Sequence, residues 1–366
     1  MCIAFFTVTQ PGFKLILASN RDEYLARPTA PAQWHNFSSP NSNPEFSNSG
    51  NGNEEQGWIL SGIDKGPTNG GTWLGITRDL RIGILTNVRL TPPTPPLEPS
   101  PNPPSRGLLL KEFLLSTSPA TCTSTSTPTD SSTPSPLSVH DYLSSHLSQV
   151  GEYEGFNLLL FSLKKSIRAL PEIGYLTNRP IPSLIDLNLN PGLNEDDDDN
   201  DNEKDVKDNL ECECLGISNS PMNEPWPKVI QGRNRMKENI KEWKERNEDD
   251  KRLVERMFNV LSQSIPINKE SDSFSSTQIP LITIPSRETE NFHNPSVEVK
   301  DRKEDSDSKL EPKPKWYGTR TSTIILVKDN GETIFVERDI LELDAEGNPK
   351  KGTGERWIEF QADLKD

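Results

Sequence analysis

Polar and proline-rich residues are gathered into five blocks, and this uneven distribution limits how much of the chain can form a packed core. Such stretches bury too little apolar surface to offset the entropy lost when they are ordered. The remaining roughly 240 residues suit one sizeable domain, so we expect residues 1–366 to form a single domain interrupted by disordered insertions. The predicted insertions are 36–56, 91–105, 116–137, 191–210 and 268–315.

The charge balance argues against a nucleic-acid partner. The chain has 40 Lys and Arg against 55 Asp and Glu, a formal net charge of −15, so a phosphate backbone would meet mostly repulsion. Its four cysteines form no disulfide framework, and its first residues lack a basic segment followed by a long apolar run. No stretch comes near the ~20 apolar residues of a membrane span. We therefore expect a cytoplasmic protein without a transmembrane segment.

Four pairs of short apolar runs predict β-hairpins, the first of them at the very start of the chain. Apolar residues at helical spacing predict three helices, which fall mostly between the strand pairs. This order indicates an α+β fold in which helices cover antiparallel sheets. The strand pairs are 2–8 with 14–19, 72–77 with 81–88, 156–163 with 168–178, and 321–327 with 333–338. The helices are 106–115, 138–150 and 251–263.

A cysteine stands at the second position, inside the first predicted strand. Initiator methionine is normally removed before a small residue, so we expect the mature chain to begin with Cys2. That residue would then carry a thiol and a free α-amino group with pKa values of ~8.5 and ~8, which makes proton exchange between them easy at neutral pH. Alternatively, Cys2 is simply a small apolar residue in a buried edge strand.

The polar sequence "NRDE" ends the second strand of the first hairpin. Antiparallel pairing can return Asn20, Arg21 and Asp22 to the vicinity of Cys2. The alternative is a turn with a surface ion pair. Three further strands end in residues that could donate hydrogen bonds to a substrate carbonyl: Asn87, Asn219 and Arg320.

Two other patterns carry weak signals. Cys212 and Cys214 have no second pair of Cys or His nearby, so we expect a mobile acidic loop and no metal site. The chain's four histidines lie in polar blocks or on a helix face, and we assign none to catalysis.

Several ordered motifs closely resemble the NRDE family of transport and Golgi organization protein 2 homologues. They are "MCIAFF", "LILASNRDEYLARP", "GGTWLGIT", "GILTNVR", "GFNLLL", "GISNSPMNEPWPKV" and "GTRTSTIILV". The family is similar to the N-terminal nucleophile hydrolases, which implies a four-layer αββα sandwich. Its members are associated with Golgi organization, protein secretion, mitochondria, lipid metabolism and haem trafficking.

The resemblance to the cysteine amidases among these hydrolases also implies roles for individual residues. Cys2 would be the nucleophile and Asp22 would hold its amino group. Asn87 and Asn219 would serve the oxyanion, and Arg320 would polarise the site. We also expect Asn20, Arg21 and Glu23 to contact a ligand.

One position departs from the pattern of those amidases, which carry an arginine where this chain has Ser19. Arg21 is next to Asp22, but adjacent strand residues point to opposite faces, so Arg21 is not an obvious substitute. Two functions stay open. In the first, the protein binds a small-molecule or lipid-like ligand, with haem as one cargo, in a pocket around Cys2 and requires no cofactor. In the second, it is a cysteine hydrolase of an amide or thioester that acts through an acyl-enzyme.

Overall fold

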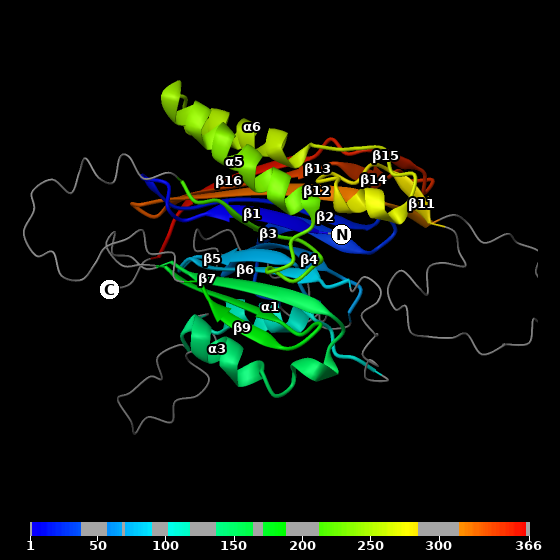
Figure 1. The fold of residues 1–366 in the computed structure, drawn as a ribbon, viewed down its shortest axis with the longest axis horizontal. Helices are drawn as coiled ribbons and strands as arrows, with labels where there is room; N and C mark the ends of the chain where they lie inside the picture. Colours follow the sequence, from blue (N-terminus) through cyan, green and yellow to red (C-terminus); the bar gives the residue numbers. More distant parts are fainter. Residues whose placement is uncertain are drawn as a thin grey trace, which may run out of the picture.

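Two β-sheets lie face to face between two pairs of helices (Figure 1). The computed structural model describes residues 2–37, 57–67, 70–89, 102–117, 137–163, 171–187, 212–284 and 315–363. The first sheet runs in the order β10 (Leu215–Ile217), β1 (Ile3–Thr7), β2 (Phe13–Tyr24), β12 (Lys315–Lys328), β13 (Glu332–Asp339), β16 (Glu355–Gln361), and β11 (Ile282–Ile284) also pairs with β12. The second runs in the order β3 (Thr29–His35), β4 (Ile59–Asp64), β5 (Leu74–Thr77), β6 (Arg81–Asn87), β7 (Phe156–Ser162), β8 (Glu172–Thr177), β9 (Ser183–Asp186).

Helices cover the outer face of each sheet, as Figure 1 shows. None of the helices within the described ranges is long and apolar enough to cross a membrane. The first sheet is covered by α5 (Pro227–Glu245) and α6 (Asp250–Leu261), and the second by α1 (Gly107–Leu115) and α3 (Val139–His146). The smaller elements are the 3-10 helices η2 (Val150–Glu152) and η3 (Glu270–Phe274), and a ribbon of β14 (Leu341–Leu343) with β15 (Pro349–Lys351).

Three apolar clusters hold these layers together. One lies between the sheets, and each of the other two lies between a sheet and its helices. Phe5 and Phe6 are neighbours in β1, yet Phe5 packs toward α5 while Phe6 packs between the sheets. Side chains alternate along a strand, so the strands β1, β2, β12 and β13 of the first sheet each serve two cores. The structure is therefore a mixed arrangement of mostly strands, with helices on the outside.

All four predicted hairpins are confirmed as antiparallel pairs, namely β1 with β2, β5 with β6, β7 with β8, and β12 with β13. The three predicted helices are confirmed as α1, α3 and α6. Helix α5 was missed, as were the strands β3, β4, β9, β14, β15 and β16. The sequence of α5 is dominated by charged residues, and Gly232 stands where its buried stripe would otherwise carry an apolar side chain.

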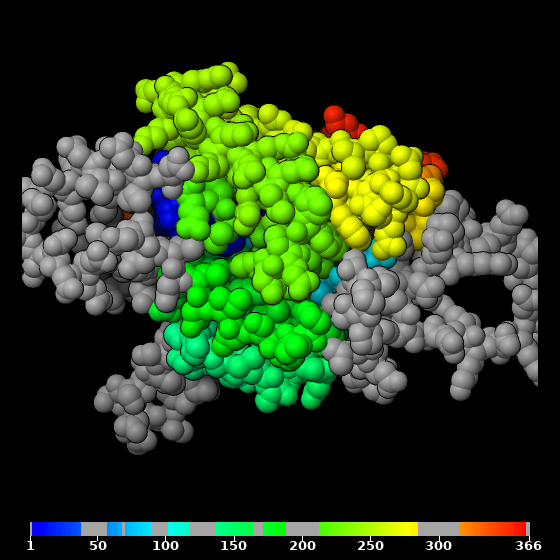
Figure 2. Space-filling view, viewed as in Figure 1, coloured from blue at the N-terminus to red at the C-terminus, as the bar shows by residue number. Residues whose placement is uncertain are grey.

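The predicted start of the insertion 268–315 was wrong, because its first part is folded. Residues 268–284, the first part of the block 268–315, contain η3 and β11. The polar average of the whole block concealed a few apolar residues, and Ile279 and Ile284 pack with Tyr317 in a small cluster of their own. Figure 2 shows this segment, in yellow, as part of the surface beside α5. Nearly all residues of the other four predicted insertions lie outside the described ranges.

Candidate functional site

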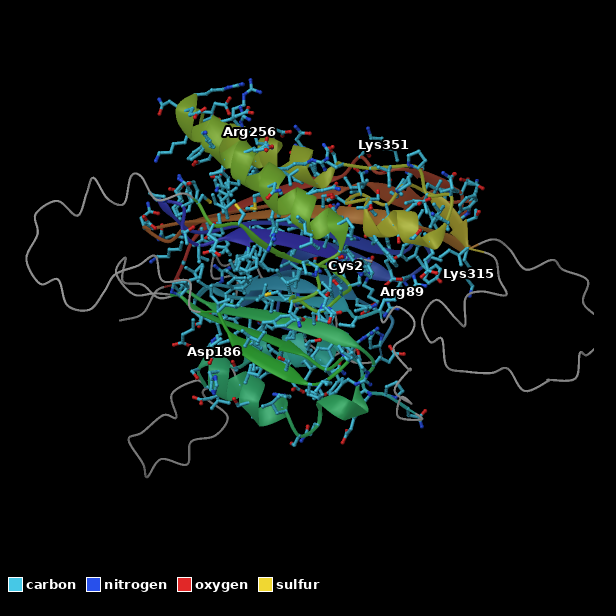
Figure 3. All side chains as sticks on the ribbon, in the orientation of Figure 1. Cys2, Arg89, Asp186, Arg256, Lys315 and Lys351 are labelled. Carbon is cyan, nitrogen blue, oxygen red and sulfur yellow. The ribbon has the colours of Figure 1, made fainter. Side chains whose placement is uncertain are left out.

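Cys2, labelled in Figure 3, immediately precedes β1. The strand registers place it level with polar residues on both neighbouring strands. In the antiparallel ladder Ile3 pairs with Asn20 of β2, so the next pair along is Cys2 with Arg21. On the other side Ala4 pairs with Ile217 of β10. Continuing this register places Asn219, two residues beyond the end of β10, level with Cys2. The structure thus brings together Cys2, Arg21 and Asn219, which are up to 217 positions apart in the sequence.

Hydrogen bonds fix the backbone and the sulfur of Cys2. The hydroxyl of Ser218 donates to the Cys2 carbonyl at 2.8 Å, and the backbone N–H of Asp22 donates to the Cys2 sulfur. Burial raises the pKa of the Cys2 thiol, and the negative charge of Asp22 adds to that rise. The positive amino terminus, the hydrogen bond from Asp22 and the charge of Arg21 each act to lower the same pKa. The reactivity of Cys2 therefore depends on which neighbouring charges are present.

Asp22 is buried, with 4% of its surface exposed. The hydroxyl of Thr319 in β12 donates to its Oδ1 at 2.5 Å, and the hydroxyl of Tyr317 donates to its backbone carbonyl at 3.2 Å. Burial raises the pKa of the Asp22 carboxyl, while the amino terminus, Lys228 and the Thr319 hydrogen bond lower it. The carboxylate is thus held in one orientation, where it can act on the amino end of the chain.

Arg21 and Glu23 face the opposite side of β2, between the two sheets. The Arg21 guanidinium carbon lies 3.9 Å from the ring centroid of Trp73, which belongs to the core between the sheets. Its Nη2 is 3.9 Å from Oε2 of Glu23, and the same carboxylate oxygen is 3.8 Å from Nε of Arg27. The predicted alternation along β2 is therefore confirmed. Cys2 nevertheless lies level with Arg21, so this guanidinium does act on the thiol.

The two asparagines predicted to serve an oxyanion lie together but present different groups. The side chain of Asn219 is buried and donates from Nδ2 to the backbone carbonyl of Asn87 at 2.6 Å. Its Oδ1 has no hydrogen-bond partner among the described residues. The side chain of Asn87 is exposed, so Asn87 contributes its carbonyl to this contact and its amide faces solvent.

Asn20, predicted to contact a ligand, instead ties β2 to neighbouring segments. Its Nδ2 donates to the carbonyls of Leu261 and Thr277 at 3.0 and 3.1 Å, and its Oδ1 accepts from the hydroxyl of Ser322 at 2.6 Å. Both amide protons are thereby used, and Asn20 has no exposed surface. These contacts give the side chain of Asn20 a structural role.

Arg320, predicted to polarise the site, occupies a β-bulge in β12. Within the described chain its guanidinium donates to the backbone carbonyls of Arg27 at 2.6 Å and Tyr24 at 3.4 Å. Burial, together with the charge of Arg21, lowers the pKa of Arg320 to about 10. The structure places this cation beside the connection from β2 to β3, and none of these contacts involves Cys2.

Two neighbours of Asp22 were missed by reasoning from the sequence. Thr319 was overlooked because the contact depends on the pairing of β2 with β12, nearly 300 residues later. Lys228 is the second residue of α5 and is completely buried. A sequence signal for Lys228 did exist. The positive end of the helix dipole favours acidic residues in the first turn, but the first turn of α5 has none and carries the cation of Lys228 in an unfavourable position.

Cys212 and Cys214 lie just before β10, where we had expected a mobile loop. Their sulfurs are 3.7 Å apart, and the Cys212 thiol is 3.2 Å from the hydroxyl of Thr7. The hydrogen bond from Cys214 lowers the pKa of Cys212 to about 7. Over the described ranges, no three His, Cys, Asp or Glu residues are grouped so that they could hold a metal ion.

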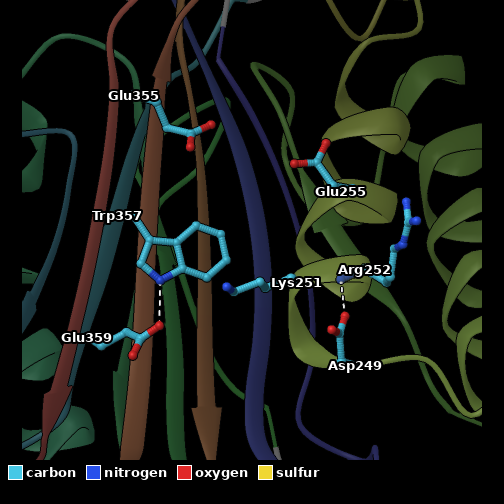
Figure 4. A pocket seen from close by; sticks show the side chains of 7 residues that line it. All are labelled: Asp249, Lys251, Arg252, Glu255, Glu355, Trp357 and Glu359. Carbon is cyan, nitrogen blue, oxygen red and sulfur yellow. Dashed lines mark hydrogen bonds between the residues drawn. The ribbon is translucent and has the colours of Figure 1, made fainter.

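A surface pocket lies elsewhere, between the start of α6 and β16 (Figure 4). The indole N–H of Trp357 donates to Glu359 at 2.6 Å on its wall. Seven residues line it: Asp249, Lys251, Arg252, Glu255, Glu355, Trp357 and Glu359. None of them is a predicted site residue, so this pocket is separate from the cluster at Cys2.

With this geometry in place, comparison with known proteins identifies the family. The sequence profile described as "Transport and Golgi organisation 2" matches residues 1–342. The chain belongs to the transport and Golgi organisation 2 family. The resemblance inferred from the motifs is thereby confirmed.

Similar members of the transport and Golgi organisation 2 family come from animals. A mouse protein named "Transport and Golgi organization 2 homolog" is 28% identical over 352 residues, covering 94% of this chain and 95% of its own. "Transport and Golgi organization protein 2" of Drosophila melanogaster is 26% identical over 364 residues, covering 96% of both. Among solved structures, a mutant conjugated bile acid hydrolase from Clostridium perfringens aligns over 99% of this chain and 98% of its own, with 9% identity and a TM-score of 0.36.

Proposed function

We propose that this protein is an N-terminal cysteine hydrolase that cleaves an amide or thioester through an acyl-enzyme on Cys2. The observation that carries the proposal is the joint fixation of Cys2 and Asp22. The Asp22 N–H holds the Cys2 sulfur, while Thr319 holds the Asp22 carboxylate. The four layers support a fold of the N-terminal nucleophile hydrolase type.

The chemistry would begin once Met1 is removed and Cys2 has a free α-amino group. That amino group takes the thiol proton, and the sulfur attacks the substrate carbonyl carbon. The bond to the leaving amine or thiol breaks, and the amino group returns the proton to the leaving group. Water, deprotonated by the same amino group, then attacks the thioester of the acyl-enzyme and releases the carboxylic acid and free Cys2. Asp22 orients the amino group throughout, and the Asn219 amide stabilises the oxyanion.

Labelling with a thioester or amide probe that traps acyl-enzymes tests this proposal. The wild-type chain should become acylated at Cys2, and Cys2→Ala should remove all labelling at that residue. Asp22→Asn should weaken it, because the amino group loses its charged anchor. Cys212→Ala is the matched control, since that thiol lies outside the cluster and its loss should leave Cys2 labelling unchanged. Labelling that is equal in wild type and Cys2→Ala would contradict the proposal.

A second candidate, a carrier for an acylated lipid or for haem, is favoured by one observation. The Nδ2 of Asn219 already donates to the Asn87 carbonyl, and the Asn87 side chain is exposed, so neither amide is fully available to an oxyanion. A carrier would release its ligand chemically intact. Cys2→Ser separates the two cargoes, because a hydroxyl is a poor substitute for a thiolate on haem iron but leaves apolar contacts to a lipid in place. Recovery of a cleaved ligand after incubation would exclude the carrier.

The name of the family also suggests a cellular role in transport and Golgi organisation for this chain, and secretion is the form of transport that we propose to measure. Deleting the protein and measuring the secretion rate of a reporter tests that role. Re-expression of wild type should restore secretion, and the comparison with Cys2→Ala shows whether the role requires the proposed chemistry. Normal secretion in the deletion would contradict it.

A further inference from the structure

Lys228 stands out among the charged residues of the described chain. It has no exposed surface, and its Nζ has no hydrogen-bond partner among the described residues. Removing an ammonium group from water costs several kcal/mol unless another charge compensates it. The Trp226 ring, whose centroid is 5.5 Å from Nζ, offers only a modest cation–π interaction. A further compensating group must therefore lie nearby.

Packing of α5 places Lys228 over the beginning of β1. The helix packs on β1 and β10, and Gly232 permits its closest approach, because a Cβ there would lie 2.0 Å from Cζ of Phe5. Lys228 precedes Gly232 by four residues and therefore lies on the same face of the helix, one turn nearer its start. Lys237, further along α5, acts on Cys212, whose sulfur lies 3.2 Å from the hydroxyl of Thr7 at the far end of β1. The start of α5, with Lys228, therefore lies toward the Cys2 end of β1.

Burial lowers the pKa of the Lys228 ammonium, while the carboxylate of Asp22, which has the larger influence of the two anions, and the thiolate of Cys2 raise it. Arg21, the other nearby cation, lies on the opposite face of β2, over Trp73 and beside Glu23. Asn20 and Asp22 share the face of β2 that is turned toward the helices. On that face Lys228 is thus the side-chain cation, among the described residues, that compensates Asp22.

We propose that Lys228 is a positioning residue of the Cys2 site: as counter-ion of Asp22, it limits how firmly Asp22 holds the positive form of the Cys2 amino group and so keeps the thiol reactive at neutral pH. This inference rests on the proposed role of Cys2 as the N-terminal nucleophile. Ser19 supplies no charge to the site, and the cation that β2 contributes is Arg21, on the face turned away from the helices. The hydroxyl of Ser19 is used elsewhere, donating to the Ile3 carbonyl at 3.0 Å.

Without Lys228, the Asp22 charge would act undiminished on both functional groups of Cys2. The ammonium form of the amino group would be favoured, and formation of the thiolate would be opposed. Other titratable groups that act on the cluster are Arg21 and Glu23 of β2, Tyr317 of β12, and Arg106, which precedes α1. They are the same in wild type and in a Lys228 variant, so a difference between the two proteins reports on Lys228.

The rate at which iodoacetamide alkylates Cys2, measured from pH 6 to 10 on the full chain, tests the inference. Peptide mass spectrometry isolates Cys2 from the other thiols. In Lys228→Met the apparent pKa of alkylation should rise by about one unit, which corresponds to an about tenfold slower reaction at neutral pH. Lys228→Arg keeps the positive charge and should stay near wild type. Lys241→Met, on the exposed face of α5, is the matched control. A folded Lys228→Met with the wild-type apparent pKa would overturn the inference.

A double variant keeps the test decisive if Lys228→Met does not fold. Removing one partner of a buried ion pair leaves an uncompensated charge, whereas removing both costs much less. Asp22→Asn combined with Lys228→Met should therefore recover the fold and melt at a higher temperature than Lys228→Met alone. Failure of the double variant to recover would overturn the pairing of Lys228 with Asp22.

The alkylation test needs no substrate, so its failure differs from failure of the hydrolase proposal. A raised apparent pKa in Lys228→Met, in a chain that cleaves no amide or thioester, would retain the role of Lys228 and refute the hydrolase. Cleavage by wild type, with the same apparent pKa in Lys228→Met, would retain the hydrolase and refute the role of Lys228.

Discussion

The hydroxyl of Thr319 donates a 2.5 Å hydrogen bond to Oδ1 of Asp22 and accepts one of 2.8 Å from the backbone N–H of Ile279. One buried side chain thereby connects the carboxylate beside Cys2 to the segment that follows α6. The position of Asp22 thus depends on β12 and on the segment that follows α6, both far from Asp22 in the sequence.

We predict that Thr319→Val lowers the free energy of unfolding by about 1–3 kcal/mol, because it leaves a buried carboxylate oxygen and a buried N–H without this partner. Thr319→Ser retains the hydroxyl and serves as the control. Urea unfolding of the three proteins measures the effect, and equal stability of the valine and serine variants would refute it.

Protonation of His35 should lower the free energy of unfolding in mild acid. Burial lowers its pKa to about 4, and its Nδ1 accepts a hydrogen bond from the Phe37 N–H, which protonation would break. The unfolded chain binds this proton near pH 6.5 and the folded chain only near pH 4. The contribution of neutral His35 to the free energy of unfolding is therefore fully present above pH 6.5 and is lost as the pH drops toward 4.

Between pH 6.5 and pH 5 this group should remove about 2 kcal/mol of stability. In His35→Gln the free energy of unfolding should fall less steeply over the same interval. Between pH 7 and pH 8 the difference in stability between the two proteins should stay constant. Parallel curves for wild type and His35→Gln from pH 7 to pH 5 would contradict the prediction.

Gly232→Ala should destabilise the protein, although alanine normally favours a helix over glycine by ~1 kcal/mol. The added methyl would overlap the ring of Phe5 and push α5 away from β1, which costs about 1–3 kcal/mol. Gly151→Ala is the control, because a Cβ there meets no atom within 4 Å. Thermal melts compare the two variants, and a Gly232→Ala chain as stable as wild type would show that α5 can shift freely.

The mature chain should begin with Cys2, because the residue after Met1 is small. Mass spectrometry of the N-terminal peptide from the native host measures this directly. Most molecules should lack Met1. If most of them retain it, Cys2 has no free amino group and the proposed self-activation fails.

Local patterns in the sequence were sufficient for the hairpins that build the centre of each sheet. Alternating apolar residues around turn residues act over a few positions, so the pairing of β1 with β2 follows from the first 24 residues alone. The same pairing brought Arg21 and Asp22 to Cys2, and the period of two along a strand placed them on opposite faces. The family was also evident from the motifs.

The contacts around those strands were decided by tertiary structure. Asn20 donates to the carbonyls of Leu261 and Thr277, and Asp22 accepts a hydrogen bond from Thr319. These partners lie in or after α6 and in β12, which are far along the chain from β2. Lys228 reaches the site only because Gly232 lets α5 touch Phe5. A local pattern describes neighbours within a turn or a hairpin. The partner of a buried charge is set by which distant element packs against it, and no local period of the sequence contains that information.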